Sequence, residues 1–279
     1  MASGRLNKKK QRKPKYLTAS DADILDLYER SVQDPSHEVA FIAQVWNDLR
    51  GRECTIIRED FCGTAAVCRA WAEQDASHTA VGVDLDQPTL DWATEKMEQT
   101  LTDDARSRVR LIHGDVMHTP LDKAQCLLAT NFSYYIFKTR SSLRTYFEAA
   151  RASITDDGLF LLDAYGGSDS FLEMEEERDV DGFTYIWDQH HYDPVTGDVV
   201  NHIHFQFPDS TKIKKAFTYE WRLWTLPEIQ ELLLEAGFSD VKIYWEGTED
   251  ESGEGDGVWT QVTSGDADEG WVAYLVASP

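Results

Sequence analysis

The pattern of apolar and polar positions predicts that strands and helices alternate over the first 165 residues. Short apolar segments rich in β-branched residues predict buried strands at 54–58, 79–84, 109–113, 124–130 and 158–164. Between them, apolar residues recur at helical spacing in 65–75, 88–100 and 140–154. This alternation predicts a parallel sheet with right-handed crossovers and helices on both faces.

Two further helices are predicted before this region, and the breaker Asp34-Pro35 separates them. The first spans 18–33 and takes Ser20 as its N-cap, and the second spans 37–49.

A different pattern follows the fifth predicted strand. Residues 183–224 carry aromatic-rich runs of period two that turn sequences interrupt, which predicts an inserted antiparallel meander. The remaining predicted elements are a helix at 225–238, a strand at 240–247, an acidic glycine-rich loop at 247–270 and a strand at 271–278. We therefore predict a basic disordered arm (1–17) and one α/β domain (18–279), with N-terminal helices at 18–50 and a β insertion at 166–224.

Charge is unevenly distributed along the chain. Residues 1–15 hold seven of the 27 Lys and Arg residues and no acid, so the remainder combines 20 basic with 50 acidic residues. Such an acidic body repels phosphate backbones, which argues against nucleic acid as a partner. We interpret the basic arm as a solvated tail, and a tether to an anionic partner is the alternative.

The four cysteines, Cys54, Cys62, Cys68 and Cys126, show no CxxC spacing and fall in predicted core elements. We expect reduced thiols rather than a disulfide or zinc framework. No apolar run reaches membrane-spanning length, and no signal-peptide pattern follows the start. These features predict a cytoplasmic protein without a membrane partner.

The stretch REDFCGTAAV (58–67) lies where a predicted strand passes into a helix. Gly63 permits a sharp turn and close approach of a ligand, and the helix beginning near Thr64 directs its free N–H groups into the crevice. Twenty-one residues after Gly63, Asp84 ends the second strand and is placed to accept hydrogen bonds from ribose hydroxyls. The sequence therefore predicts a nucleoside-binding crevice.

Two carboxylates at this crevice, Glu59 and Asp60, discriminate between nucleosides. They would repel the pyrophosphate of a dinucleotide, and Phe61 and Ala65 stand where such a site needs further glycines. S-adenosylmethionine has no phosphate and carries an ammonium and a sulfonium, which suit these acids. We therefore predict S-adenosylmethionine as the cofactor.

Four segments in chain order resemble the motifs of class I S-adenosylmethionine-dependent methyltransferases. They are EDFCGTA, VGVDLD, HGDVMHTP (113–120) and ATNFSYYIF (129–137). The resemblance covers about residues 50–165 and returns at 225–279, and it implies a Rossmann-like, mostly parallel sheet of seven strands whose last strand is antiparallel. Phe61 and Ala65 depart from the family's glycines, which leaves Glu59 and Asp60 as alternatives for its acidic position, and strand register favours Glu59.

The resemblance implies a role for each strand end. Glu59 would hold the methionine ammonium, Gly63 and Thr64 would line the methionine, Asp84 would bind the ribose, and Asp115 would accept from the adenine amine. The whole implied cofactor-binding set is Glu59, Asp60, Gly63, Thr64, Asp84, Leu85, Asp115, Val116 and Asn131.

The acceptor of the methyl group is expected beyond the ends of strands four and five, at 131–134, Asp163 and Tyr165. The tetrad Asn131-Phe132-Ser133-Tyr134 resembles the Asn-Pro-Pro-Tyr tetrad of methyltransferases that act on planar amino nitrogens, although both prolines are missing. This resemblance implies catalytic roles for Asn131 and Tyr134, and a strand end followed by core aromatics is the alternative.

The meander offers further candidate residues. If DPVTGD closes a four-residue hairpin loop, Tyr192 pairs with Val199. The predicted apolar face then carries Ile186, Tyr192, Val199, Ile203, Phe205 and Phe207, and the polar aromatic face carries Tyr185, Trp187, Gln189, His191, His202 and His204. We expect this second face to cap the acceptor. Any of His191, His202 and His204 could serve as general base, with His191 as the catalytic candidate, and we predict no metal site.

We predict methyl transfer from S-adenosylmethionine to a small-molecule acceptor, with nitrogen favoured over oxygen. One alternative is an RNA or protein N-methyltransferase that docks through the basic arm, and deletion of residues 1–15 discriminates it. Another is a non-catalytic regulatory protein that binds S-adenosylmethionine. The β insertion is also a possible homodimer interface.

Overall fold

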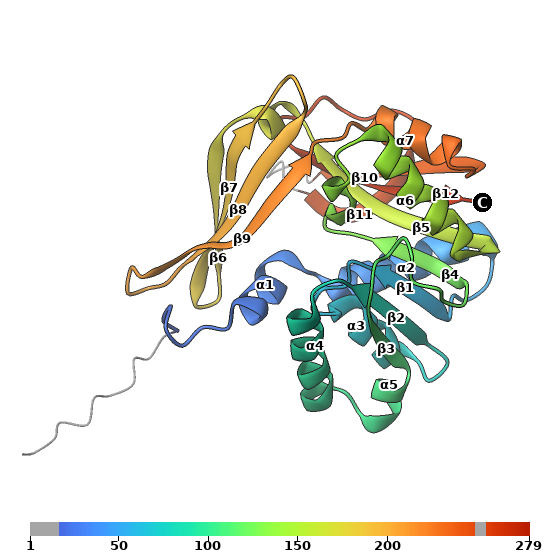
Figure 1. Ribbon diagram of the computed structural model, residues 1–279, viewed down its shortest axis with the longest axis horizontal. Helices are drawn as coiled ribbons and strands as arrows, with labels where there is room; N and C mark the ends of the chain where they lie inside the picture. Colours follow the sequence, from blue (N-terminus) through green and yellow to red (C-terminus); the bar gives the residue numbers. More distant parts are fainter. Residues whose placement is uncertain (1–16, 249–254) are drawn as a thin grey trace, which may run out of the picture.

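The computed structural model describes residues 17–248 and 255–279, and within them two sheets are separated by helix α1 (Ile24–Val32) (Figure 1). The larger sheet has eight strands in the order β11-β10-β12-β5-β4-β1-β2-β3. Its strands are β1 (Ile56–Asp60), β2 (Thr79–Asp84), β3 (Val109–His113), β4 (Ala124–Ala129), β5 (Ile154–Gly166), β10 (Asp240–Thr248), β11 (Gly255–Val262) and β12 (Trp271–Ser278). Strands β1 to β5 are parallel, and β12 runs antiparallel to both β5 and β10.

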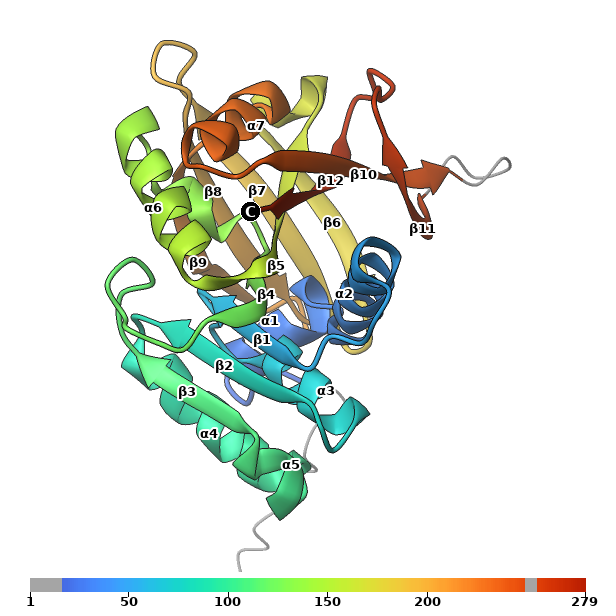
Figure 2. The same cartoon turned by 90° about the vertical axis from the view of Figure 1, so that its right-hand side faces the viewer.

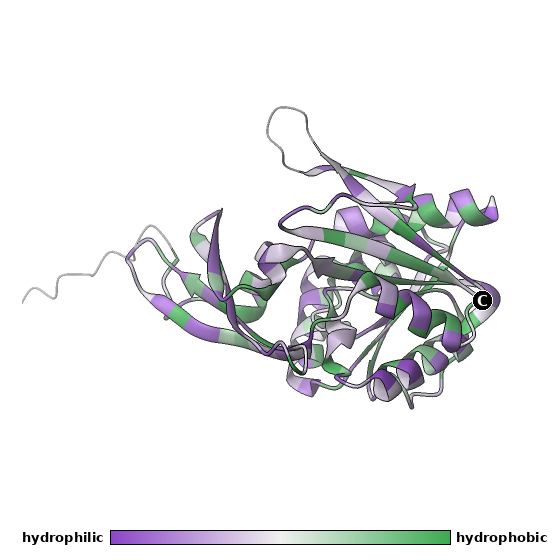
Figure 3. Cartoon of the chain, turned by 90° about the horizontal axis from the view of Figure 1, so that it is seen from above, coloured by the Kyte–Doolittle hydropathy of each residue, from purple (hydrophilic) through white to green (hydrophobic). Residues whose placement is uncertain are grey.

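Helices cover both faces of this sheet, as the alternating pattern predicts (Figure 2). The other helices are α2 (Pro35–Arg50), α3 (Ala66–Gln74), α4 (Gln87–Thr100), α5 (Asp103–Ser107), α6 (Arg140–Ala152) and α7 (Leu226–Glu235), with short 3-10 turns η1 (Ser133–Ile136) and η2 (Ser168–Phe171). In β4, Cys126 and Leu128 pack in the core beneath α2, α3 and α4, whereas Leu127 and Ala129 pack against α6 and α7. Apolar residues are accordingly concentrated on the strands, with polar residues on the outer sides of the helices (Figure 3).

Local sequence explains the helix boundaries. Asp34 caps α2 by accepting from His37 N, Pro35 takes the first turn, and Gly51 ends the helix with a φ of 65°. The predicted N-cap of the first helix was wrong: Asp23 rather than Ser20 caps α1, because its carboxylate accepts from Leu25 N at 2.9 Å.

The smaller sheet is the insertion that follows β5. It contains β6 (Met174–Val180), β7 (Phe183–Tyr192), β8 (Asp198–Gln206) and β9 (Lys212–Arg222) in that order, and neighbouring strands are antiparallel. Leu27 of α1 packs against Ile203 and Phe205 of β8, so α1 lies between the two sheets (Figure 1).

Two expectations about strands need correction. The larger sheet has eight strands rather than seven, because β11 forms within the segment expected to be an acidic loop. Six residues of that loop, 249–254, and the predicted arm up to residue 16 lie outside the described residues. Strand β6 also lies before the predicted meander. The sequence did not predict it as a strand because its polar sequence MEEERDV lacks the alternation that marks a strand.

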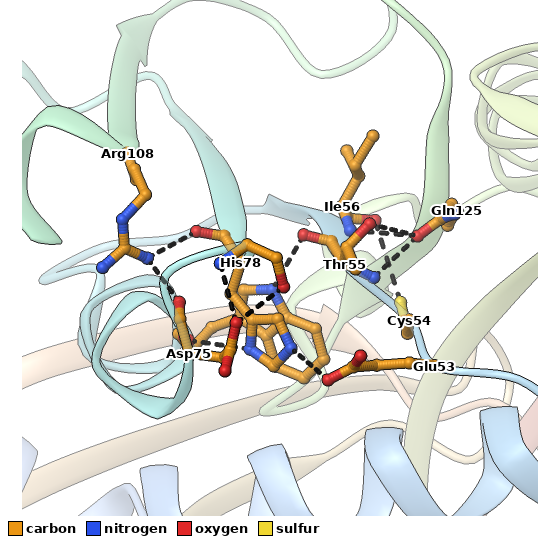
Figure 4. A network of polar contacts seen from close by, with 10 residues as sticks. Glu53, Cys54, Thr55, Ile56, Asp75, His78, Arg108 and Gln125 are labelled. Carbon is orange, nitrogen blue, oxygen red and sulfur yellow. Dashed lines mark hydrogen bonds and ion pairs between the residues drawn. The ribbon is translucent and has the colours of Figure 1, made fainter.

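The amino ends of the parallel strands are held by a polar network that lies away from the carboxyl ends (Figure 4). Gln125 at the start of β4 accepts from Thr55 N at 2.7 Å, which joins it to the residue before β1. Arg108 donates to the carbonyl oxygens of Asp75 and His78, both at 2.7 Å. These contacts satisfy backbone groups at the amino ends of the strands and serve stability.

All four cysteines are free and buried, as predicted. Within residues 17–248 and 255–279, no helix is both long and apolar enough to cross a membrane.

Candidate functional site

The loop between β1 and α3 lies at the carboxyl ends of the parallel strands, where the sequence predicts a nucleoside-binding crevice. Gly63 has a φ of 50°, and a Cβ at this position would meet no atom within 4 Å, so the backbone faces open space. Phe61 and Ala65 adopt similar left-handed conformations, with φ of 58° and 57°. Phe61 and Ala65 therefore keep the backbone conformation that glycine favours, although neither is a glycine. A left-handed conformation at a residue other than glycine costs about 1–3 kcal/mol.

Asp84 connects this loop to the end of β2. Its carboxylate accepts from Gly63 N at 2.8 Å and from Asp86 N at 2.9 Å. The side chain of the neighbouring Leu85 is 64% exposed. The end of β2 thus places an acceptor and an apolar surface side by side, as a ribose and an attached base require.

The end of β3 lies beside β2 and is followed by Asp115 and Val116, which the resemblance places at the adenine. Asp115 accepts from Met117 N at 2.9 Å, and this hydrogen bond lowers its pKa, so the carboxylate is ionised at neutral pH. Val116 is buried, and its carbonyl oxygen accepts from Arg58.

The two acids that end β1 have separate partners. Glu59 is buried against α3, where it accepts from the backbone N and the Sγ of Cys68, and burial raises its pKa to about 7. Asp60 forms a buried ion pair with Arg58 at 2.7 Å and accepts from Tyr146 Oη at 3.1 Å. Asp60 is therefore engaged in the core, which leaves Glu59 as the better candidate for the family's acidic position.

A strained turn after β4 lies at the centre of the same edge. Asn131 and Phe132 both have a φ of 57°, and their N–H groups donate to the two carboxyl oxygens of Asp163 at 2.8 Å. Burial raises the pKa of Asp163 to about 7. Tyr134, predicted to be catalytic, is fully buried, and its hydroxyl donates to the carbonyl oxygen of Asp163 at 2.7 Å. Tyr134 therefore belongs to the core, whereas Asn131 borders open space.

That open space is a cavity of about 710 Å³ between the two sheets. Asn131, Phe132, Asp163 and Tyr165 line it from the strand ends. Aromatic side chains from α1, the smaller sheet and β12 form much of the remaining wall, and they are Tyr28, Tyr185, Trp187, Tyr219, Trp221, Trp271 and Tyr274. The volume falls in the range of about 300–1,000 Å³ that is typical of small-molecule sites.

Helix α1 spans the region between crevice and cavity. Glu29 pairs with Arg69 of α3, and Asp26 pairs with Lys96 of α4 at 3.0 Å. Tyr28 on the same helix lines the cavity. These ion pairs hold α1 against both helices that flank the crevice.

The predicted face assignment in the meander is half wrong. Tyr192 pairs with Val199 as expected, but the register shifts between Gln189 and His191, so His190 is an extra residue in β7. Trp187 consequently lies opposite Ile203 and faces the cavity with it, whereas Ile186 lies opposite His204. The one-residue bulge reverses the side on which every earlier residue of β7 points.

The predicted histidines do not line the cavity. His191 is exposed, and its Nδ1 lies 3.0 Å from Glu173 Oε1. His202 and His204 lie on the opposite face of β8 from Ile203. The expectation that His191 acts on an acceptor was therefore wrong.

One cavity acid was missed by sequence reasoning. Glu38 of α2 lines the cavity and accepts from Tyr274 Oη at 2.8 Å. Burial, followed by the nearby charge of Asp163, raises the pKa of Glu38 to about 8. Its position in the apolar stripe with Phe41, Ile42 and Val45 was a signal, because an acid rarely occupies such a face.

We expect Glu38→Gln to change the pH dependence of stability. A carboxyl whose pKa rises from 4.5 to about 8 on folding stabilises the folded state fully below about pH 4.5. That contribution is lost as the pH rises through 8, so the wild-type melting temperature should fall between pH 6 and 9. Glutamine keeps the hydrogen bond but cannot ionise, so the variant should fall less and be the more stable protein at pH 9.

Thermal denaturation without added ligand at each pH measures this effect. The control is Glu148→Gln, which removes an acid that is about half exposed on α6. Identical pH profiles for Glu38→Gln and the wild type would contradict the assignment.

Comparison with known proteins agrees with the architecture. No family model and no curated protein matches the sequence. Three of the solved structures that are similar to it each match nine tenths or more of this chain. An S-adenosylmethionine-dependent methyltransferase from Clostridium acetobutylicum shares 18% identity over 91% of this chain and 96% of its own, with a TM-score of 0.65.

The other two structures come from Streptomyces and Streptoalloteichus species. DesVI from Streptomyces venezuelae is 17% identical over 92% of this chain and 97% of its own, with a TM-score of 0.65. The sugar N-methyltransferase KedS8 from Streptoalloteichus is 14% identical over 100% of this chain and 98% of its own, with a TM-score of 0.60. The predicted fold is confirmed: the chain has the Rossmann-like fold of the class I S-adenosylmethionine-dependent methyltransferases.

Proposed function

We propose that this protein transfers a methyl group from S-adenosylmethionine to the nitrogen of a small-molecule amine. The observation that carries the proposal is the 710 Å³ cavity, which opens at Asn131 and Asp163 and combines aromatic walls with carboxyl groups. Aromatic faces and carboxylates both attract an amine cation. The crevice beside the cavity suits a nucleoside that bears no phosphate.

The chain's residues fit the cofactor at each of its parts. Gly63 offers open backbone, Asp84 offers carboxylate oxygens for the ribose hydroxyls, and the exposed Leu85 offers an apolar surface for the base. Asp115 would accept from the adenine amine, and Glu59 would attract the methionine ammonium. S-adenosylmethionine supplies a methyl group on a sulfonium sulfur, which leaves as a neutral thioether.

The protein's contribution to the reaction is position, exclusion of water and removal of a proton. The bound ammonium would first lose a proton, and the lone pair so freed on nitrogen would attack the methyl carbon as the carbon–sulfur bond breaks toward sulfur. The turn at Asn131 would align the amine, and the aromatic wall would keep water out. Glu38 would accept that proton in its ionised form, whose share rises as the pH approaches its pKa of about 8.

Nitrogen is favoured over oxygen for two reasons. An acidic aromatic cavity binds a cation better than a neutral alcohol, and a released ammonium proton needs only a weak base. In addition, the solved structures that share this fold include KedS8, described as a sugar N-methyltransferase, and MtfA, described as a glycopeptide N-methyltransferase. An amine on a sugar or peptide scaffold is therefore the acceptor class to test first.

The test has two stages. Calorimetry with S-adenosylmethionine, S-adenosylhomocysteine, NAD and ATP first measures which nucleoside binds, and we expect only the first two to do so. Isotope-labelled S-adenosylmethionine is then offered with amino sugars, amino-acid amides and their hydroxyl counterparts, and mass spectrometry detects the methylated product.

Each outcome has a separate meaning. Tight binding of NAD or ATP without binding of S-adenosylmethionine would refute the cofactor assignment. Preferential methylation of the hydroxyl compounds would refute the nitrogen assignment. Cofactor binding without methylation of any compound offered would support a regulatory binding protein instead.

A further inference from the structure

A cluster of imidazole and carboxylate groups lies on the outer face of the smaller sheet, opposite the cavity. Asp188, His190 and His202 each offer a ligand atom, and these atoms all lie within 4.8 Å of one another. Asp188 on β7 is directly opposite His202 on β8, and it is also directly opposite Glu175 on β6. Three adjacent strands therefore contribute to one cluster, which the proposed methyl transfer does not use.

His202 carries the observation that points to a ligand. The residue is only 3% exposed, and its buried Nε2 has no hydrogen-bond partner. Its Nδ1 lies 2.9 Å from Thr218 Oγ1, which fixes the ring. An unpaired buried ring nitrogen costs about 1–3 kcal/mol, so a partner that completes it would stabilise the fold.

The hydrogen bond at Nδ1 leaves Nε2 of His202 free to bind a metal ion. A neutral imidazole whose second nitrogen is hydrogen-bonded is the usual arrangement of a metal-binding histidine.

The bulge in β7 brings His190 into the cluster. Its Nδ1 lies 3.7 Å from Asp188 Oδ2, and its ring centroid is 4.9 Å from that of His202. In a tetrahedral zinc site the ligand atoms are about 3.3 Å apart, because each bond is about 2.0–2.1 Å long. The exposed side chain of His190 can rotate to close this difference.

His204 takes a supporting role rather than a coordinating one. Its Nδ1 accepts from Lys215 N at 2.6 Å, so the proton of the neutral ring is on Nε2. That Nε2 donates to Asp188 Oδ2 at 3.1 Å. His204 therefore orients the carboxylate, and it cannot bind a metal through Nε2 in this tautomer.

We propose that Asp188, His190 and His202 bind one divalent zinc-type metal ion on the outer face of the smaller sheet. Two imidazoles and one carboxylate favour Zn²⁺ over Mg²⁺ or Ca²⁺, which prefer oxygen ligands. Water or the facing Glu175 completes the coordination. The ion joins β7 to β8 across the bulge, and so it stabilises the sheet whose other face forms the cavity wall.

The experiment compares metal binding by the full chain and single variants after treatment with a chelator. Calorimetry should show one Zn²⁺ per chain, and Zn²⁺ should raise the melting temperature while Mg²⁺ does not. His190→Ala should weaken Zn²⁺ binding at least about 100-fold, and His204→Gln should weaken it about 10–100-fold. Bound Co²⁺ should show the absorption of a tetrahedral site in the wild type and not in His190→Ala.

The control is His191→Ala, which removes an adjacent exposed imidazole outside the cluster and should leave Zn²⁺ affinity unchanged. Equal affinities of His190→Ala and His191→Ala would overturn the proposal, as would equal stabilisation by Mg²⁺ and Zn²⁺, which would indicate binding to the acidic surface only. Because His190 is an exposed bulge residue, its replacement should not prevent folding. All readouts concern metal binding, so the proposed methyl transfer stands or falls separately.

Discussion

Replacement of Asp84 with alanine should weaken the binding of S-adenosylmethionine about 100-fold or more. The carboxylate now holds Gly63 N at 2.8 Å and Asp86 N at 2.9 Å, and in the proposed complex it also accepts from the ribose. Hydrogen bonds to a charged group contribute about 1.5–3 kcal/mol each, and a loss of two corresponds to at least this factor. The variant also frees the loop that must meet the methionine.

Calorimetric titration with S-adenosylmethionine and S-adenosylhomocysteine measures the loss. Asp84→Asn should lie between the wild type and the alanine variant, because an amide keeps one acceptor oxygen. The matched control is Asp91→Ala, which removes an exposed acid of α4 and should bind the cofactor normally. Wild-type affinity in Asp84→Ala would place the ribose elsewhere.

The geometry at the ends of β1 and β2, where we place the cofactor, could be predicted from the sequence because local rules determine it. Gly63 and Asp84 follow strands whose apolar runs are unambiguous, and parallel strands bring their carboxyl ends to one edge. Gly63 and Asp84 are therefore close in space although they are 21 residues apart in the sequence. The hydrogen bond between Gly63 N and Asp84 confirms that these two residues meet.

The acceptor side could not be predicted in the same way because it depends on tertiary packing. One extra residue, His190, exchanged the two faces of β7, and no turn or composition signal marks a bulge in the middle of a strand. Glu38 and Tyr28 reach the cavity only because α1 and α2 pack across the strand ends. Such contacts between distant segments leave little trace in a single sequence.

The eighth strand shows a third limit on sequence reasoning. The segment that forms β11 includes Val258 and Trp259, which suit a strand, but its acidic and glycine-rich surroundings predict a loop. Pairing with β10 over Ile243 to Thr248 overrides that local preference.

Replacement of Asp163 with alanine should reduce the free energy of unfolding by about 2–6 kcal/mol at pH 6. The carboxyl oxygens hold the N–H groups of Asn131 and Phe132 at 2.8 Å, and each buried N–H group that loses its acceptor costs about 1–3 kcal/mol. Burial raises the pKa of Asp163 to about 7, so the carboxyl stabilises the fold most at low pH and this contribution is lost as the pH rises through 7. The loss caused by the alanine variant should therefore be smaller at pH 8 than at pH 6. Asn131 and Phe132 both have left-handed backbone conformations, which the carboxyl group helps to hold.

Urea denaturation measures the change, and Asp163→Asn distinguishes the cause. The amide oxygen can accept from only one of the two N–H groups, and its NH₂ group opposes the other, so this variant should lose at least half of the same free energy. Asp169→Asn is the matched control, because it changes another acid of the cavity whose side chain is near only Ser168, at 3.4 Å. We expect that control to stay within about 0.5 kcal/mol of the wild type. If Asp163→Asn were equally stable, the turn at Asn131 would be held by its own packing, and Asp163 would be free to act on the acceptor.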